Sequence, residues 1–265
     1  MTSRTDGGVD LLAIGPHPDD VELFCGGILI RMADLGHTTA VLDLTEGERA
    51  SNGDVATRRA EAAAAAKVLG LSVRENLGLP DTWLSPWSGH DLEAPARLAR
   101  SQVVRVVEAI RRLKPELVLI PWSEARHPDH SAASELLTKA LFFAHVARFE
   151  TPAALAPHRV RRVLYYAQRH TMSPTFVVDT TEAAERKREA IACYASQVAR
   201  PATPTLVGAP GALDALDARD RYFGSMIGVA HGEPLRVVEV LGIDDPVAHF
   251  RRHDYPHAFV IEGRR

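Results

Sequence analysis

The feature that most constrains the fold is an alternation of short apolar runs with helix-forming segments along the chain. Runs such as VDLLAIG (9–15) and TTAVLDLT (38–45) are almost continuously apolar, which is typical of strands buried on both faces of a parallel sheet. Candidate strands cover 9–15, 38–45, 73–79, 116–122, 162–168 and 175–181, and candidate helices lie near 20–35, 54–69, 95–113, 131–146, 181–199 and 212–227. This order predicts an α/β fold with a mainly parallel sheet sandwiched by helices.

Length, charge and cysteine content narrow the class of protein. A chain of 265 residues without an obvious linker favours a single domain, with a core at about 9–240 and a C-terminal tail at 241–265. The formal net charge is −3 and the basic residues are dispersed, which argues against a nucleic-acid partner. Two cysteines, no apolar leader and no run of roughly 18 apolar residues argue against disulfides, secretion and a membrane span. We therefore expect a cytoplasmic protein.

Polar clusters follow four successive predicted strands. The first strand runs into HPDD (17–20) and the fourth into RHPDH (126–130), while Glu46 follows the second strand and Asp81 the third. In an open α/β sheet, ligands bind outside the carboxyl ends of the strands, so these side chains are expected at one edge. Two of the four clusters share a His-Pro-Asp grouping. Their coincidence on one edge predicts a functional site there.

A divalent metal accounts for these residue types. Catalytic zinc takes three protein ligands from His and Asp or Glu and keeps one position open for water. His17 and Asp20 are three residues apart across a turn into a helix, and His130 can complete the set. Asp19 then remains free to take a proton from water whose pKa the metal lowers to about 7. The ligands suit metal-assisted hydrolysis of an amide or ester.

A second pair lies beside these ligands. Asp129 can orient His127, and a protonated His127 could stabilise a developing oxyanion or protonate the leaving group. Simpler interpretations exist for single residues, because an aspartate after a strand is often only a helix N-cap. Two histidines and a carboxylate also form the facial triad of non-haem iron oxygenases, which is a second hypothesis. A catalytically silent sugar-binding protein is a third, although the candidate base is present.

The two His-Pro-Asp clusters carry a family resemblance. GPHPDDVELFCGG (15–27) together with RHPDHSAA (126–133) resembles the LmbE-like (PIG-L) deacetylases, zinc-dependent enzymes that remove acetyl groups from N-acetylglucosaminyl compounds. Within that family the chain is most similar to the N-acetylglucosaminyl-malate deacetylases of bacillithiol biosynthesis. The similarity covers most of 10–236, including DLTEGERASNG (43–53) and YFGSMIGVAHGEPL (222–235).

The resemblance implies a Rossmann-like α/β domain assembled as a homo-oligomer, a trimer or a hexamer. It implies zinc on His17, Asp20 and His130, Asp19 as general base and His127 oriented by Asp129 as the electrostatic or acid partner. Iron(II) is an alternative metal, because it can exchange with zinc without a change of ligands. It also assigns Arg58 to substrate binding and Tyr194 to the oxyanion; the pattern alone would make Tyr194 a helix-face residue.

The expected substrate is a small amino sugar, with N-acetylglucosaminyl-malate as the leading candidate. A malate aglycone needs cations, for which Arg58, Arg126 and Arg49 are available, because arginine binds carboxylates in bidentate fashion. Glu46 and Asp81 complete the substrate-binding candidates. The alternative is another N-acetylglucosamine derivative, of the chitobiose type or a different thiol precursor. Departures from the family pattern at Pro16 and His231, and the tail at 241–265, leave that choice open.

Overall fold

Seven strands form one sheet in the order β3-β2-β1-β4-β5-β7-β6. The computed structural model describes residues 7–88, 101–169, 172–199 and 203–252. The strands are β1 (Leu11–Gly15), β2 (Thr39–Thr45), β3 (Val73–Leu79), β4 (Leu117–Pro121), β5 (Arg162–Tyr166), β6 (Phe176–Asp179) and β7 (Gly232–Arg236). The pairs from β3 through to β5 are parallel, and β7 lies antiparallel to both β5 and β6.

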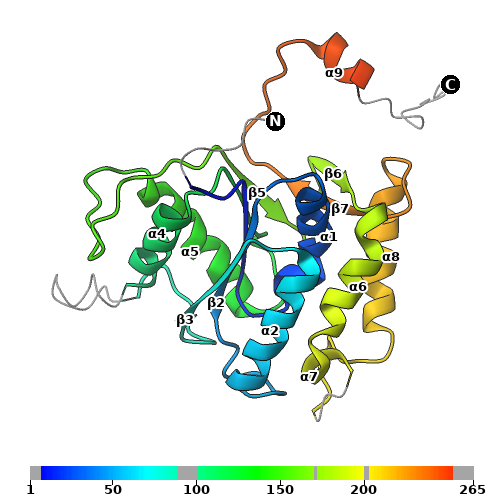
Figure 1. Ribbon diagram of the computed structural model, residues 1–265, viewed down its shortest axis with the longest axis horizontal. Coiled ribbons are helices and arrows are strands. Elements are labelled where there is room, and N and C mark those ends of the chain that lie inside the picture. The colour runs from blue at the N-terminus through cyan, green and yellow to red at the C-terminus, as the bar shows by residue number, and fades with distance from the viewer. Residues whose placement is uncertain (1–6, 89–100, 170–171, 200–202, 253–265) are drawn as a thin grey trace.

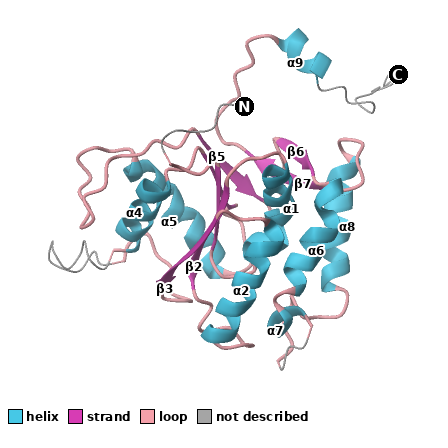
Figure 2. Ribbon diagram, in the orientation of Figure 1, coloured by secondary structure: helices cyan, strands magenta, loops and turns pink. Residues whose placement is uncertain are grey.

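Helices cover both faces of this sheet (Figure 1). They are α1 (Asp20–Asp34), α2 (Val55–Leu69), α4 (Gln102–Leu113), α5 (Pro128–Ala144), the 3-10 turn η1 (Thr181–Ala183), α6 (Ala184–Ala192), α7 (Ala195–Val198), α8 (Ala212–Ser225) and α9 (Pro246–Arg252). Helices α4 and α5 lie on one side of the strands, and α1, α2, α6 and α8 lie on the other (Figure 2). Successive β1 side chains enter the two cores alternately, Leu12 and Ile14 on the α4–α5 side and Leu11 and Ala13 on the other. Because both faces are buried, the strand reads as a continuous apolar run.

The predicted α/β fold with a mainly parallel sheet is confirmed, with differences in its second half. The six predicted strands form, but the sequence pattern missed β7, whose segment GEPLR contains a glycine, a proline and a buried glutamate. The single helix predicted over 181–199 is divided into η1, α6 and α7. The start of the helix predicted over 95–113, residues 95–100, lies outside the described residues, as do residues 253–265 of the tail. The division between core and tail stays a prediction.

The strand order creates a crevice at one place. From β1 the chain moves outward through β2 and β3, then crosses back to place β4 on the other side of β1. The connections that leave the carboxyl ends of β1 and β4 therefore run in opposite directions, which opens a crevice between them. Both His-Pro-Asp clusters follow these two strands. Across the described part of the chain, no helix is long and apolar enough to cross a bilayer.

Candidate active site

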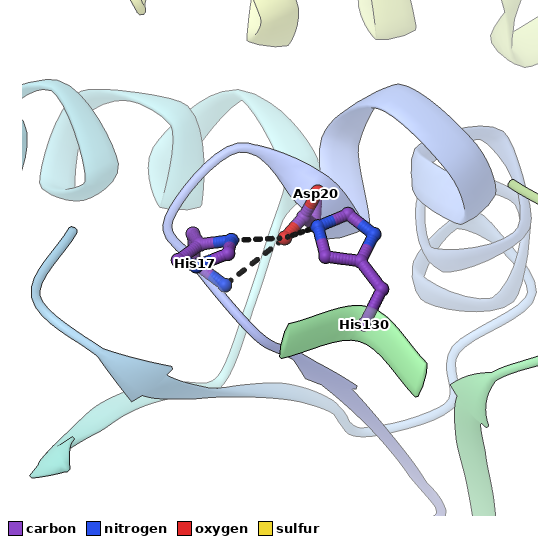
Figure 3. A group of neighbouring side chains, drawn as sticks. All are labelled: His17, Asp20 and His130. Carbon is purple, nitrogen blue, oxygen red and sulfur yellow. Dashed lines mark hydrogen bonds and ion pairs between the residues drawn. The ribbon is translucent and has the colours of Figure 1, made fainter. Parts of the chain in front are cut away.

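The carboxylate of Asp20 lies between two imidazole rings at this crevice (Figure 3). Its Oδ2 atom is 3.2 Å from His17 Nδ1 and 3.3 Å from His130 Nε2. Ligands held at about 2.0–2.1 Å from a tetrahedral zinc ion lie about 3.3 Å from one another. The three side chains that the sequence predicts as ligands therefore have the mutual spacing of a metal-binding group. A second group, His17, His127 and Asp129, also brings its ligand atoms within 4.8 Å of one another.

The first cluster is shaped by the backbone of Asp19. Asp19 is the N-cap of α1 and has φ 109°, in the left-handed region, without a side-chain capping bond. Such a conformation costs a non-glycine residue about 1–3 kcal/mol and persists only where the surroundings enforce it. The preceding strand exit is fixed because Thr45 donates to the Pro16 carbonyl from both its N–H and its hydroxyl, each at 3.0 Å. The turn leaves the Asp19 carboxylate available to the crevice instead of to the helix end.

In the second His-Pro-Asp cluster, RHPDH (126–130), the helix begins directly after the histidine. Helix α5 begins at Pro128, with His127 as the N-cap. Proline is favoured in this first position because its missing N–H would have no helical partner. The N–H of Asp129 donates to His127 Nδ1 at 3.2 Å. A neutral imidazole that accepts at Nδ1 carries its proton on Nε2, so His127 has a donor left for another partner.

The carboxylate of Asp129 has a different partner from the expected one. It was predicted to orient His127, but its Oδ2 atom lies 3.4 Å from His17 Nε2 and accepts from the Thr82 N–H at 2.7 Å. Asp81, which was predicted to bind substrate, contacts the same nitrogen: its Oδ1 atom is 3.1 Å from His17 Nε2. Carboxylates on the outer nitrogen of a metal-binding histidine fix its tautomer and raise its basicity. Asp81 and Asp129 thus orient His17, whose other nitrogen faces Asp20.

His130 has its own outer partner, which the sequence analysis missed. Its Nδ1 contacts the Oε1 atom of Gln168, a buried residue just after β5. Gln168 ends the run RVLYYAQ (162–168), so the same strand-end rule that found the other clusters would have indicated it. Both histidines of the metal-binding group therefore have their second nitrogen engaged by a protein oxygen.

The charges around His17 suit a divalent cation. Burial alone would lower the pKa of His17, but hydrogen bonds to Asp129, Asp20 and Asp81 raise it well above its ordinary value. Burial tends to raise the pKa of Asp20, and His130 and His17 outweigh that effect and lower it. The pKa of Asp81 falls to about 2, because its bonds to His17 and to the N–H groups of Arg49 and Thr82 outweigh burial. A site rich in carboxylates that favours positive charge fits a metal ion.

Asp19 is held apart from these ligands. Burial raises its pKa to about 7, against the lowering effect of Arg58 and with a further rise from Asp20. The Arg58 Nη2 atom lies 3.3 Å from Asp19 Oδ2 and also donates to the Pro18 carbonyl. A divalent cation on the neighbouring ligands would lower this pKa again. Asp19 is placed as a carboxylate that can exchange a proton beside the metal-binding group.

These residues open into a cavity of about 310 Å³. Its wall includes His17, Asp19, Asp20, His127, His130, Gln168, Arg49, Arg58, Asp81, Arg126 and Arg169. Burial lowers the pKa of Arg169, and the positive charges of Arg126 and Arg219 lower it further. The wall thus carries both the catalytic candidates and several guanidinium groups. Arg169 was not among the residues singled out from the sequence.

Three predicted residues are not part of the cavity wall: Asp129, which contacts His17, and Tyr194 and Glu46. Tyr194 is fully buried behind it, and its hydroxyl donates to Glu22 at 3.0 Å. Glu46 lines a neighbouring hollow and pairs with Arg59. The structure therefore gives Tyr194 a buried partner instead of a place beside a substrate carbonyl.

Comparison with known proteins identifies the family. The model of the PIG-L family, GlcNAc-PI de-N-acetylase, matches residues 12–141, which include both His-Pro-Asp clusters. The chain is also 32% identical over 200 residues to the diacetylchitobiose deacetylase of Thermococcus kodakarensis, a match that covers 71% of this chain and 69% of that protein. The chain belongs to the PIG-L family. The predicted family resemblance is confirmed at this level.

Solved structures of similar fold extend the match to most of this PIG-L chain. A conserved protein of Thermus thermophilus superposes with a TM-score of 0.76 at 36% identity, covering 89% of this chain and 98% of that one. The N,N'-diacetylchitobiose deacetylase of Pyrococcus horikoshii, solved with an inhibitor, superposes with a TM-score of 0.72 at 25% identity, covering 86% of this chain and 83% of that one.

Proposed function

We propose that this PIG-L protein is a metal-dependent hydrolase that removes the N-acetyl group from an N-acetylglucosaminide. One observation carries the proposal: the group of His17, Asp20 and His130 opens into the same cavity as Asp19 and His127. A divalent cation held by those three ligands supplies a Lewis acid that polarises the amide carbonyl and acidifies the attacking water. Zinc suits this nitrogen and oxygen ligand set, and iron(II) is the alternative.

The protein groups divide the remaining chemistry between them. Asp19 Oδ2 accepts a proton from the attacking water as the water oxygen bonds to the acetyl carbon. The Nε2–H of His127 donates to the carbonyl oxygen and stabilises the negative charge that develops there. The proton taken up by Asp19 then passes to the departing amine nitrogen, so that the C–N bond breaks to give acetate and a free amino sugar. Arg58 keeps the Asp19 carboxylate in place.

The finer proposal is that the substrate is N-acetylglucosaminyl-malate. Arg49, Arg126 and Arg169 on the cavity wall would recognise the two malate carboxylates. A second candidate, a diacetylchitobiose-type substrate, is favoured by the similarity to the Thermococcus kodakarensis enzyme. An oxygenase reaction uses the same ligand types but leaves His127 without a task. Family membership favours hydrolysis over it and over silent sugar binding.

Acetate release tests the proposal directly. Zinc-loaded protein is incubated with N-acetylglucosaminyl-malate, N-acetylglucosamine and diacetylchitobiose, and free acetate is measured over time. We expect turnover of the malate compound with the highest kcat/KM. Faster turnover of diacetylchitobiose would keep the chemistry and replace the substrate. If the metal-loaded protein releases acetate from none of the three, the deacetylase proposal is wrong for this substrate class.

The arginines on the cavity wall give a substrate-specific prediction. Replacing Arg126 with glutamine is expected to lower the ratio of kcat/KM for the malate compound over diacetylchitobiose by about 10- to 100-fold, because one charge-assisted carboxylate contact contributes about 1.5–3 kcal/mol. Steady-state kinetics on both substrates measure the ratio. Arg112→Gln is the matched control, since Arg112 pairs with Glu75 outside the cavity. An unchanged ratio in Arg126→Gln would remove the malate assignment from this arginine.

Assembly as a trimer or hexamer and a cytoplasmic location stay predictions of the sequence resemblance and composition. So does the role of Tyr194 at the oxyanion, which its buried hydrogen bond to Glu22 does not favour.

A further inference from the structure

A second cluster of buried charges lies behind the metal-binding group and takes no part in the proposed chemistry. Its centre is Glu22, which is 0% exposed and stands in the first turn of α1, two residues after Asp20. A carboxylate buried to this extent persists only where it is paired and hydrogen-bonded. Its partners therefore indicate what holds this turn of the helix.

Glu22 is tied to the sheet through Arg74. The Arg74 Nη1 atom lies 2.5 Å from Glu22 Oε1. The same guanidinium binds Asp43 in bidentate fashion, with Nε 2.8 Å from Oδ2 and Nη2 2.9 Å from Oδ1. Asp43 stands on β2 and Arg74 on β3, so the pair anchors the helix turn to two neighbouring strands. Such fork-shaped pairs fix orientation as well as distance.

Tyr194 connects this anchor to the other side of the turn. Its hydroxyl donates to Glu22 Oε1 at 3.0 Å, while the guanidinium carbon of Arg58 lies 6.0 Å from the centre of its ring. Arg58 in turn pairs with Asp19. Glu22 and Asp19 lie on either side of Asp20 in the sequence. Glu22 contacts the buried Tyr194 directly, and Asp19 is connected to the same tyrosine through Arg58.

A break in α1 separates this turn from the rest of the helix. Cys25 has non-helical angles, φ −146° and ψ 19°. Beyond it the N–H groups of Gly27 and Ile28 donate to another fully buried carboxylate, Glu233, at 3.0 and 2.7 Å. The first turn of α1 therefore has its own anchor, distinct from the one that holds the second half of the helix.

We propose that Glu22, fixed by Arg74 and Tyr194, is a positioning residue that sets where Asp19 and Asp20 stand in the active site. Asp19 keeps a left-handed backbone that neighbouring contacts must enforce, and Asp20 must keep its spacing to two histidines. Glu22 acts on both through the backbone of one helix turn. The inference rests on the proposed function for its catalytic consequence, but its effect on metal binding does not require a known substrate.

Two substitutions at Glu22 distinguish the loss of its contacts from the loss of its charge. Methionine removes both contacts at similar volume and leaves Arg74 balanced by Asp43, whereas glutamine keeps an oxygen that can accept from Arg74 and Tyr194. For Glu22→Met we expect cobalt(II) affinity and kcat each to fall by about tenfold, with a changed cobalt absorption spectrum, as for loss of an outer partner of a metal ligand. For Glu22→Gln we expect both quantities within about threefold of the wild type, since the contact geometry is retained.

Controls at buried polar groups outside the proposed anchor make the test specific. Glu233→Met removes an equally buried carboxylate beyond the Cys25 break, and we expect it to lower thermal stability without changing cobalt affinity. Tyr194→Phe deletes only the hydroxyl on Glu22, and Tyr166→Phe deletes a buried hydroxyl that donates to Ile14. Tyr194→Phe should weaken cobalt binding by about threefold and alter its spectrum, and Tyr166→Phe should do neither.

The outcomes decide between positioning and plain structural support. If Glu22→Met and Tyr194→Phe bind cobalt(II) with wild-type affinity and spectrum, the proposal is overturned, whatever their stability. It is also overturned if Glu233→Met weakens cobalt binding as much as Glu22→Met. If Glu22→Met does not fold, the pair Tyr194→Phe and Tyr166→Phe decides alone. A wild-type protein that binds cobalt but releases no acetate would count against the proposed function and not against this one.

Discussion

Replacing Asp19 with asparagine is expected to lower kcat by about a thousandfold while the metal stays bound. The expected loss is that of a general base, whose contribution is about 10²–10⁴-fold. Asparagine is the informative substitution because it tolerates the left-handed backbone that Asp19 adopts, φ 109°, better than alanine does. The variant therefore changes the proton acceptor and not the turn. Acetate release and metal content by elemental analysis are measured on the same preparation.

A matched control for this substitution is Asp54→Asn. Asp54 is the N-cap of α2 and accepts from the Thr57 N–H at 2.7 Å, a role in which asparagine performs about as well. We expect its kcat to equal that of the wild type. An Asp19→Asn enzyme that kept more than about a tenth of wild-type kcat, outside the range for a lost base, would exclude Asp19 from that role.

Loss of a metal ligand is also expected to have a large effect, on metal affinity and therefore on activity. Replacing His130 with alanine removes one of the two imidazoles on Asp20, and metal affinity should fall by more than roughly a hundredfold, the upper end for loss of an outer partner. His130→Ala should lose activity together with the metal. Chelation should likewise abolish the activity of the wild type, and added zinc should restore it. Chelation should also lower the melting temperature, because a cation that binds only the folded state stabilises it.

Gln168→Ala is expected to have an intermediate effect on metal affinity, between the wild type and His130→Ala. Gln168 contacts the other nitrogen of His130, so its loss should weaken metal binding by about tenfold without abolishing it. Titration with zinc against a competing chelator gives the affinities. Full activity after complete removal of metal, checked by elemental analysis, would disprove metal dependence. Equal affinities for the wild type and His130→Ala would remove His130 from the ligand set.

The two His-Pro-Asp clusters show how similar sequence can serve different roles. In the first, α1 begins at Asp20, so Asp19 occupies the strained turn and faces the cavity. In the second, α5 begins at Pro128, so Asp129 stands inside the first helical turn and reaches back to His17. The position at which each helix begins therefore makes one aspartate the candidate base and the other an orienting group.

The sequence by itself determined the fold class and the edge of the sheet that carries the site. Apolar periodicity and helix propensity are local signals, so the strands from β1 to β6 and the rim clusters could be predicted from short windows. The rule that ligands bind beyond the carboxyl ends of parallel strands then placed His17, Asp20 and His130 together. Strand β7 was not predicted because GEPLR has little strand character by itself. Its place between β5 and β6 depends on pairing with both.

Only the tertiary structure decided which partner each polar side chain has. Asp81 meets His17 across 64 positions of the chain, and Tyr194 meets Glu22 across 172. Local sequence carries no information about such distances, and a carboxylate or hydroxyl can satisfy many partners equally well. The fold placed Asp129 on His17 instead of His127, gave His130 the oxygen of Gln168, and brought the Tyr194 hydroxyl to the buried carboxylate of Glu22. The physical reason is that buried polar groups must be paired, and the geometry of the packed chain determines which groups come within reach.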